Sequence, residues 1–261
     1  MKQSVFLGLV MVITLVVAFV IWQFILGNPG NFADGETRHV PLRGNLLGTV
    51  YTGGIIVPIL IMLTLMNLTI VFERIFSLRK AQGKGSMIAF LKKVQGALIG
   101  GKVDDAIKEC DAQRGSAANI IRAGLTRYKE VVGDSNLDGE KKMAETKRAI
   151  EEATSLETPL LERNLIALST IASVATMFGL LGTVIGMIRA FTALAAQGGA
   201  PDAISLSIGI SEALINTALG LIAAILGIVA YNFFVTKVDN FTYMIDEASY
   251  NVAEILSSKT K

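Results

Sequence analysis

Hydrophobic residues gather in four long runs that polar segments separate. The first three runs contain no charged residue and the fourth contains only Glu212; the runs cover Val5–Leu26, Leu46–Phe72, Asn164–Ile188 and Ala203–Val235. A helix rises about 1.5 Å per residue, so about 20 apolar residues are enough to cross the hydrocarbon core of a bilayer. The pattern therefore predicts an all-α membrane protein with four transmembrane helices.

The first run has an alternative interpretation as a signal peptide, because Lys2 precedes it. Its apolar part is longer than the about 7–15 residues usual in such peptides, and no Ala-x-Ala cleavage site ends it. We expect a retained N-terminal transmembrane helix over residues 1–27, with cleavage as the alternative.

Apolar residues at three- and four-residue spacings predict further helices between the second and third runs. Amphipathic helices are expected over Met87–Gly100, Val103–Asp111 and Ala117–Val132. From Glu140 an apolar stripe leads into the third run, so one long helix is expected there if Pro159 only bends it. No stretch of useful length alternates as a strand would. We therefore expect long helices that extend from the membrane into a helical cytoplasmic domain.

The positions of lysine and arginine set the expected orientation. Residues 74–163 hold 17 of the 24 basic residues, whereas residues 28–45 hold only Arg38 and Arg43. Cytoplasmic segments carry the excess of basic residues, so both termini are expected inside. The expected organisation is a transmembrane helix (1–27), a periplasmic loop (28–45), a transmembrane helix (46–73), a cytoplasmic helical domain (74–163), a transmembrane helix (164–193), a periplasmic turn (194–203), a transmembrane helix (204–236) and a cytoplasmic C-terminal helix (237–261).

Composition argues against several classes of protein. The net charge is only +2 and residues 74–163 mix both signs, which disfavours nucleic acid as a partner. The only histidine, His39, lies in the outer loop, and no cluster of catalytic or metal-ligating side chains is visible. We therefore expect no enzymatic activity, no cofactor and no metal. The only cysteine, Cys110, is expected to be a buried, small apolar residue.

Glu212 is the most informative residue of the chain. A carboxylate in hydrocarbon is costly unless it is protonated, paired or facing water. Asn216 shares its helix face and Thr217 stands at the edge of that face. A second line of hydroxyls lies on one face of the third run; it includes Ser173, Thr176 and Thr183. These lines predict a buried ion or proton path or a bond between helices; the alternative is that the hydroxyls bond their own backbone carbonyls.

Small residues accompany these polar groups in the last two runs. Glycines at helical spacing let two helix backbones approach closely, which predicts tight packing around Gly179, Gly182, Gly186 and Gly220. Arg189, shortly before the outer turn, is expected to extend its side chain to that interface, and a bond to a neighbouring subunit is an alternative.

Two segments of these runs resemble a known family. Residues 179–187 read GLLGTVIGM and residues 210–221 read ISEALINTALGL. They are similar to signatures of the MotA/TolQ/ExbB proton-channel family, closest to ExbB and TolQ. A weaker similarity covers Lys102–Leu125, and the resemblance as a whole covers Leu46–Val235. Two departures are the pair Ala175–Thr176, where members commonly have Ala-Pro, and the helix at Val5–Leu26, which is additional to the usual three.

The resemblance implies a function. It implies a homopentameric ring around two copies of an ExbD/TolR-type partner, whose single membrane helix carries a protonatable aspartate. Matched residue by residue, Thr183 and Thr217 are the family's pore-facing threonines, and Glu212 is its intramembrane glutamate, with either a relay or a structural role. The chain would be a proton-channel and stator subunit of a bacterial inner-membrane motor that acts on TonB- or TolA-type proteins, among membrane lipids. The alternatives are a non-conducting membrane scaffold and a gliding or flagellar-type stator of the same family.

Overall fold

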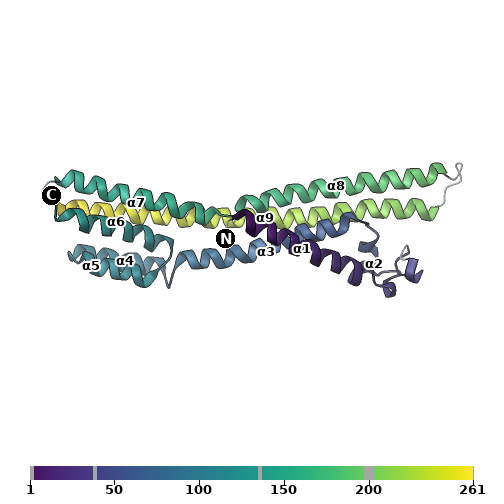
Figure 1. The fold of residues 1–261 in the computed structure, drawn as a ribbon, viewed down its shortest axis with the longest axis horizontal. Helices are drawn as coiled ribbons and strands as arrows, with labels where there is room; N and C mark the ends of the chain where they lie inside the picture. The colour runs from purple at the N-terminus through teal and green to yellow at the C-terminus, as the bar shows by residue number, and fades with distance from the viewer. Residues whose placement is uncertain (1–2, 38–39, 135–136, 197–202, 261) are drawn as a thin grey trace. The chain divides into compact units, whose positions relative to one another are not determined.

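The computed structural model describes residues 3–37, 40–134, 137–196 and 203–260. Within these residues the chain is almost entirely helical, and the only strand-like pairing is an isolated bridge between Phe32 and Pro41. Figure 1 shows the helices in chain order. Their bounds are α1 Gln3–Val20, α2 Leu46–Tyr51, α3 Ile56–Gln82, α4 Met87–Ile99, α5 Val103–Gln113, α6 Ser116–Val132, α7 Gly139–Glu162, α8 Leu165–Ala196 and α9 Ala203–Thr260. The prediction of an all-α fold is confirmed.

The chain divides into two compact units. The first unit contains Met1–Phe72 and Asn164–Asn232, and the second contains Glu73–Arg163 and Phe233–Lys261. Among the described residues, four helices are long and apolar enough to cross a membrane, as the four hydrophobic runs predict. The N-terminal one continues from α1 through a π-helical turn at Ile21–Leu26. The protein is therefore a multi-pass membrane protein.

The second hydrophobic run is broken rather than only bent. Short α2 ends at Tyr51, a turn follows, and α3 starts at Ile56. Gly54 in that turn has a φ of +75°, a left-handed conformation that glycine adopts at little cost. Pro58 lies in the first turn of α3, where a missing backbone N–H breaks no helical hydrogen bond.

The expected single helix from Glu140 through the third run is wrong. Pro159 lies inside α7, which continues past it to Glu162. The break occurs at Asn164, which has a φ of +63°, and α8 begins at the next residue. Asparagine enters the left-handed region more readily than most residues, so it ends a helix where an apolar stripe alone gives no signal.

The amphipathic helices predicted between the second and third runs are confirmed as α4, α5 and α6. Their apolar faces meet the C-terminal part of α9 in the core of the second unit. This core includes Phe90, Val94, Leu98, Cys110, Leu125, Val252 and Leu256. Cys110 is a free cysteine and is only 2% exposed, so its predicted burial is confirmed.

In the first unit, α8 and the N-terminal part of α9 run side by side as an antiparallel pair (Figure 1). Glycines line the contact. A Cβ atom built on Gly220 would lie 2.8 Å from both the Ala175 carbonyl oxygen and the Gly179 Cα atom. One built on Gly186 would lie 2.7 Å from the Ala213 nitrogen. Gly182 faces the side chain of Asn216 in the same way. At Gly186 and Gly220 the two backbones approach too closely for any larger residue.

The glycine contact makes a prediction for stability in detergent. Gly220→Ala forces a methyl group against the backbone of α8 and is expected to destabilise the first unit by about 1–3 kcal/mol, the usual cost of overpacking. Gly8→Ala is the matched control, because a Cβ atom there meets nothing within 4 Å. Denaturant titration of both variants checks this; equal midpoints for Gly220→Ala and the unmodified protein would contradict it.

The buried thiol makes a prediction for reactivity and pH. Burial raises the pKa of Cys110 from its ordinary value of 9.0 to about 12. The folded protein should therefore hold about a thousandfold less thiolate at pH 8 than an ordinary thiol, and maleimide labelling should require unfolding. The unfolded chain ionises first, so this residue's contribution to stability is constant below pH 9 and falls as the pH rises toward 12.

Labelling kinetics with and without denaturant measure the effect. Ser86→Cys in a Cys110→Ala background is the control, because residue 86 is exposed at the start of α4. Equal labelling rates for the two thiols in the folded protein would show that Cys110 is accessible.

Candidate functional site

Glu212 is paired with a cation from the neighbouring helix. Its side chain lies on α9 and is 7% exposed, and its Oε1 accepts a hydrogen bond from Nη1 of Arg189 on α8 at 2.5 Å. The Arg189 side chain is 56% exposed. The buried carboxylate thus has a compensating charge within its own chain, which removes much of the cost of placing it in an apolar unit.

The turn between α2 and α3 covers the same part of α9. A Cβ atom on Gly54 would lie 2.8 Å from Oε1 of Glu212, so the backbone of this turn lies directly against the carboxylate. One helical turn further on, Nδ2 of Asn216 donates to the carbonyl oxygen of Gly53 at 2.8 Å. Asn216 is fully buried, and its Oδ1 has no hydrogen-bond partner among the described residues. Glu212 and Asn216 therefore fasten α9 to this turn.

Thr183 and Thr217 meet across the contact between α8 and α9. Their hydroxyl groups form a short hydrogen bond in which either oxygen can be the donor. Both hydroxyls also lie near the carbonyl oxygen of Gly179, Thr183 at 3.2 Å and Thr217 at 3.4 Å. Both side chains are only half-buried. A pair of hydroxyls, each both donor and acceptor, can accept a proton on one side and release one on the other.

The other predicted hydroxyls do not join this pair. Ser173 is exposed and donates to the Ser169 carbonyl oxygen at 3.1 Å. Thr176 is half-buried and donates to the Ala172 carbonyl oxygen, also at 3.1 Å. Each bonds within its own helix, as the alternative interpretation of the hydroxyl line expects.

Arg189 is the functional residue whose partner the sequence pattern did not identify. The pattern placed its side chain toward the outer interface, with a neighbouring subunit as the alternative. The spacing of residues from the segment that connects α8 and α9 could have identified this partner, because the two helices form an antiparallel pair. Residues about equally far from the connecting segment face each other, and this relation holds for Arg189 with Glu212 and for Thr183 with Thr217.

A second buried amide was also missed. Asn67 of α3 is 1% exposed, and its Nδ2 donates to the Ala223 carbonyl oxygen of α9 at 2.9 Å. Like Asn216, it joins the α3 region to α9 and leaves its Oδ1 without a partner among the described residues. In the part of the chain that the structure describes, no group of three histidine, cysteine, aspartate or glutamate side chains is placed to hold a metal ion.

The ion pair makes a prediction for a double-mutant cycle. Arg189→Met leaves the Glu212 carboxylate buried without a cation, and it should destabilise the protein by about 2 kcal/mol, less than for a fully buried pair because Arg189 is half exposed. Glu212→Gln in the same chain removes the uncompensated charge and should restore most of that loss. Denaturant titration of the two single variants and the double variant measures the coupling; strictly additive effects would show that the two side chains are independent.

Comparison with known proteins identifies relatives of this chain. Residues 112–247, just over half of the chain, match the model of the "MotA/TolQ/ExbB proton channel family". The chain is 38% identical over 118 residues to the Tol-Pal system protein TolQ of Pseudomonas aeruginosa, covering 45% of this chain and 51% of that protein. It is 28% identical over 204 residues to a putative biopolymer transport protein ExbB homolog of Methanothermobacter thermautotrophicus, covering 75% of this chain and 66% of that protein.

A third relative is the Tol-Pal system protein TolQ of Haemophilus influenzae, 44% identical over 96 residues, which cover 36% of this chain and 41% of that protein. The aligned part thus spans about half or less of the two TolQ proteins. The region that matches the family model contains the Thr183–Thr217 and Arg189–Glu212 pairs. The chain belongs to the MotA/TolQ/ExbB proton channel family.

Proposed function

We propose that this chain is the channel and stator subunit of a proton-driven motor in a bacterial inner membrane. In this proposal several copies, five by resemblance to the family, form a ring around a dimer of an ExbD/TolR-type partner. Proton flow moves the partner, and the partner energises a TonB- or Tol-type process at the outer membrane. The observation that carries the proposal is the half-buried hydroxyl pair of Thr183 and Thr217.

The pair has the properties that a proton path through an apolar wall requires. Its two oxygens accept and donate in either direction, and its partial exposure leaves it available to a group outside this chain. The glycines beside it are buried in the contact between α8 and α9 and let the two helices approach closely, which keeps the two hydroxyls together. Each proton that crosses the membrane releases about 2.3 kcal/mol per 100 mV, so a few protons per step supply useful work.

Glu212 has a structural role in this proposal. Its carboxylate already accepts a hydrogen bond from Arg189 and lies against Gly54, and its side chain is almost fully buried. A relay group has to exchange its proton with the path at every step, which would break this ion pair each time. The protonatable acid therefore comes from the partner's helix, and Glu212 with Asn216 holds the outer half of α9 in position.

Proton flux through vesicles tests the proposal. Vesicles containing this chain and its ExbD/TolR-type partner should acidify when a potential is applied, and Thr217→Val should reduce the rate at least about tenfold, a change of about 1.4 kcal/mol in the barrier. Valine keeps the shape of threonine and removes only the hydroxyl group. The partner should still co-purify with the variant.

Thr69→Val is the matched control. Thr69 is also half-buried in the first unit, and its hydroxyl donates to the Leu65 carbonyl oxygen of its own helix at 2.8 Å. Its loss should leave the flux unchanged. A complex that assembles but conducts no protons in the unmodified form would identify a scaffold and overturn the proposal.

A further inference from the structure

The second unit contains a cavity with an excess of positive charge. Its volume is about 490 Å³, and it lies where the chain leaving α3 crosses the turn between α5 and α6. Lys80, Lys84 and Arg114 line it, and none of these three forms an ion pair with another described residue. Glu157 is the acid of the lining, and its Oε1 accepts a hydrogen bond from Asn119 at 2.8 Å.

The backbone around this cavity is fixed by hydrogen bonds. The amide of Lys84 donates to the Gln113 carbonyl oxygen at 2.7 Å, and the 7% exposed Gln113 side chain donates back to the Gln82 carbonyl oxygen at 3.1 Å. Gly83 and Gly115 cross so closely that a Cβ atom on Gly115 would lie 2.7 Å from the Gly83 nitrogen. The crossing thus fixes the backbone at Lys84 and Arg114, and with Lys80 from the end of α3 three like charges line one cavity, although like charges repel.

The N-terminus of α6 opens into the same cavity. Gly115 is its cap and provides no side-chain acceptor, so the first amide groups of this 17-residue helix remain available to an anion. Ser116 lines the cavity, and its side chain adds a hydroxyl donor beside the helix N-terminus. Three cations, a hydroxyl group and a helix N-terminus that line one cavity indicate a ligand that accepts hydrogen bonds and carries negative charge.

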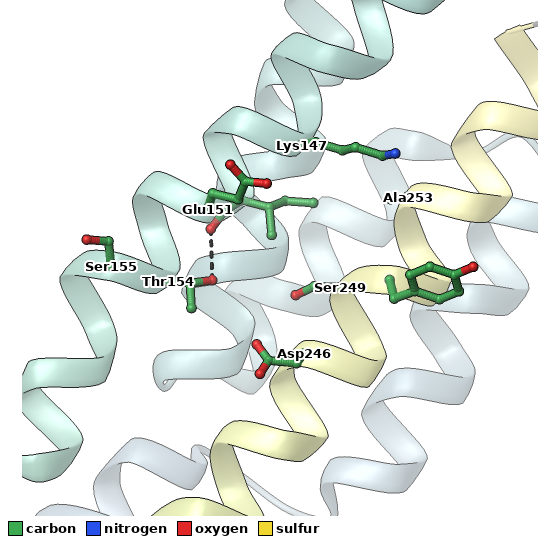
Figure 2. A pocket seen from close by; sticks show the side chains of 9 residues that line it. Lys147, Glu151, Thr154, Ser155, Asp246, Ser249 and Ala253 are labelled. Carbon is green, nitrogen blue, oxygen red and sulfur yellow. Dashed lines mark hydrogen bonds between the residues drawn. The ribbon is translucent and has the colours of Figure 1, made fainter.

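The larger cavity of the same unit, of about 540 Å³, does not have this character. Figure 2 shows it between α7 and α9, with Ser249 between the two helices. There Lys147 is accompanied by two acids, Glu151 and Asp246, so its charged lining is net negative. An anion should therefore bind in the cavity at the crossing rather than in this one. Lys147 provides a control position for substitutions of the cations at the crossing.

We propose that the cavity at the crossing binds a phosphate group, from either free phosphate or the headgroup of an acidic lipid. Lysine, arginine and the amide groups of a helix N-terminus are the donors that proteins use for phosphate. A lipid is one source because Lys80 follows Phe72, the end of the second hydrophobic run, by only eight residues. The site is separate from the hydroxyl pair and its test does not depend on proton flux.

Calorimetric titration of the full-length chain in neutral detergent tests the site. Inorganic phosphate and short-chain phosphatidylglycerol are titrated separately, with phosphatidylcholine as the uncharged lipid. Arg114→Gly and Lys84→Gln should each weaken binding at least about tenfold, a typical effect of losing one charge-assisted contact. Arg114→Gly keeps the fold, because Arg114 has a φ of 57° that glycine adopts more readily. Lys147→Gln removes the same charge elsewhere and should change nothing.

The outcomes separate the two sources. Binding of inorganic phosphate that Arg114→Gly weakens identifies free phosphate as sufficient, whereas selective binding of phosphatidylglycerol identifies a lipid site. No binding of either compound, or equal binding by Arg114→Gly, Lys84→Gln and Lys147→Gln, overturns the proposal. Thermal unfolding of each variant confirms that any loss of binding occurs in folded protein.

Discussion

The close approach of α8 and α9 is the constraint on which the first unit depends. Gly179, Gly186 and Gly220 lack the Cβ atoms that would press against the backbone of the neighbouring helix. Only at this separation can the short side chains of Thr183 and Thr217 touch. The approach is driven by packing rather than by the exclusion of water, since lipid is as apolar as the helix surface. Shape therefore determines the position of each polar group along the pair.

The polar groups of this unit fall into two sets. Asn67, Asn216 and Glu212 are buried and bonded to a carbonyl or a cation of another helix or of the turn before α3, so they hold these segments in register. The hydroxyls of Thr183 and Thr217 are half-buried and bonded mainly to each other. Buried polar groups must be satisfied within the protein. The first set therefore stabilises the fold, and the second retains hydrogen-bonding capacity for a group outside the chain.

Local pattern predicts the helices well and their breaks poorly. The hydrophobic runs and the amphipathic faces of α4, α5 and α6 are properties of neighbouring residues, so they can be read in the sequence. The break at Asn164 depends on one left-handed residue that no periodicity marks. The Arg189–Glu212 pair and the crossing of Gly83 with Gly115 depend on segments that folding brings together. Such contacts require the register between helices, which composition does not give.

The turn between α2 and α3 has a consequence for how this chain can change over evolutionary time. Gly54 lies against the carboxylate of Glu212, and its left-handed backbone disfavours larger residues. The two positions are far apart in the sequence but share one small space. Lineages that keep the acid should keep the glycine, and in lineages that lose the acid the left-handed backbone still favours glycine at position 54. Position 54 should therefore vary less than position 212.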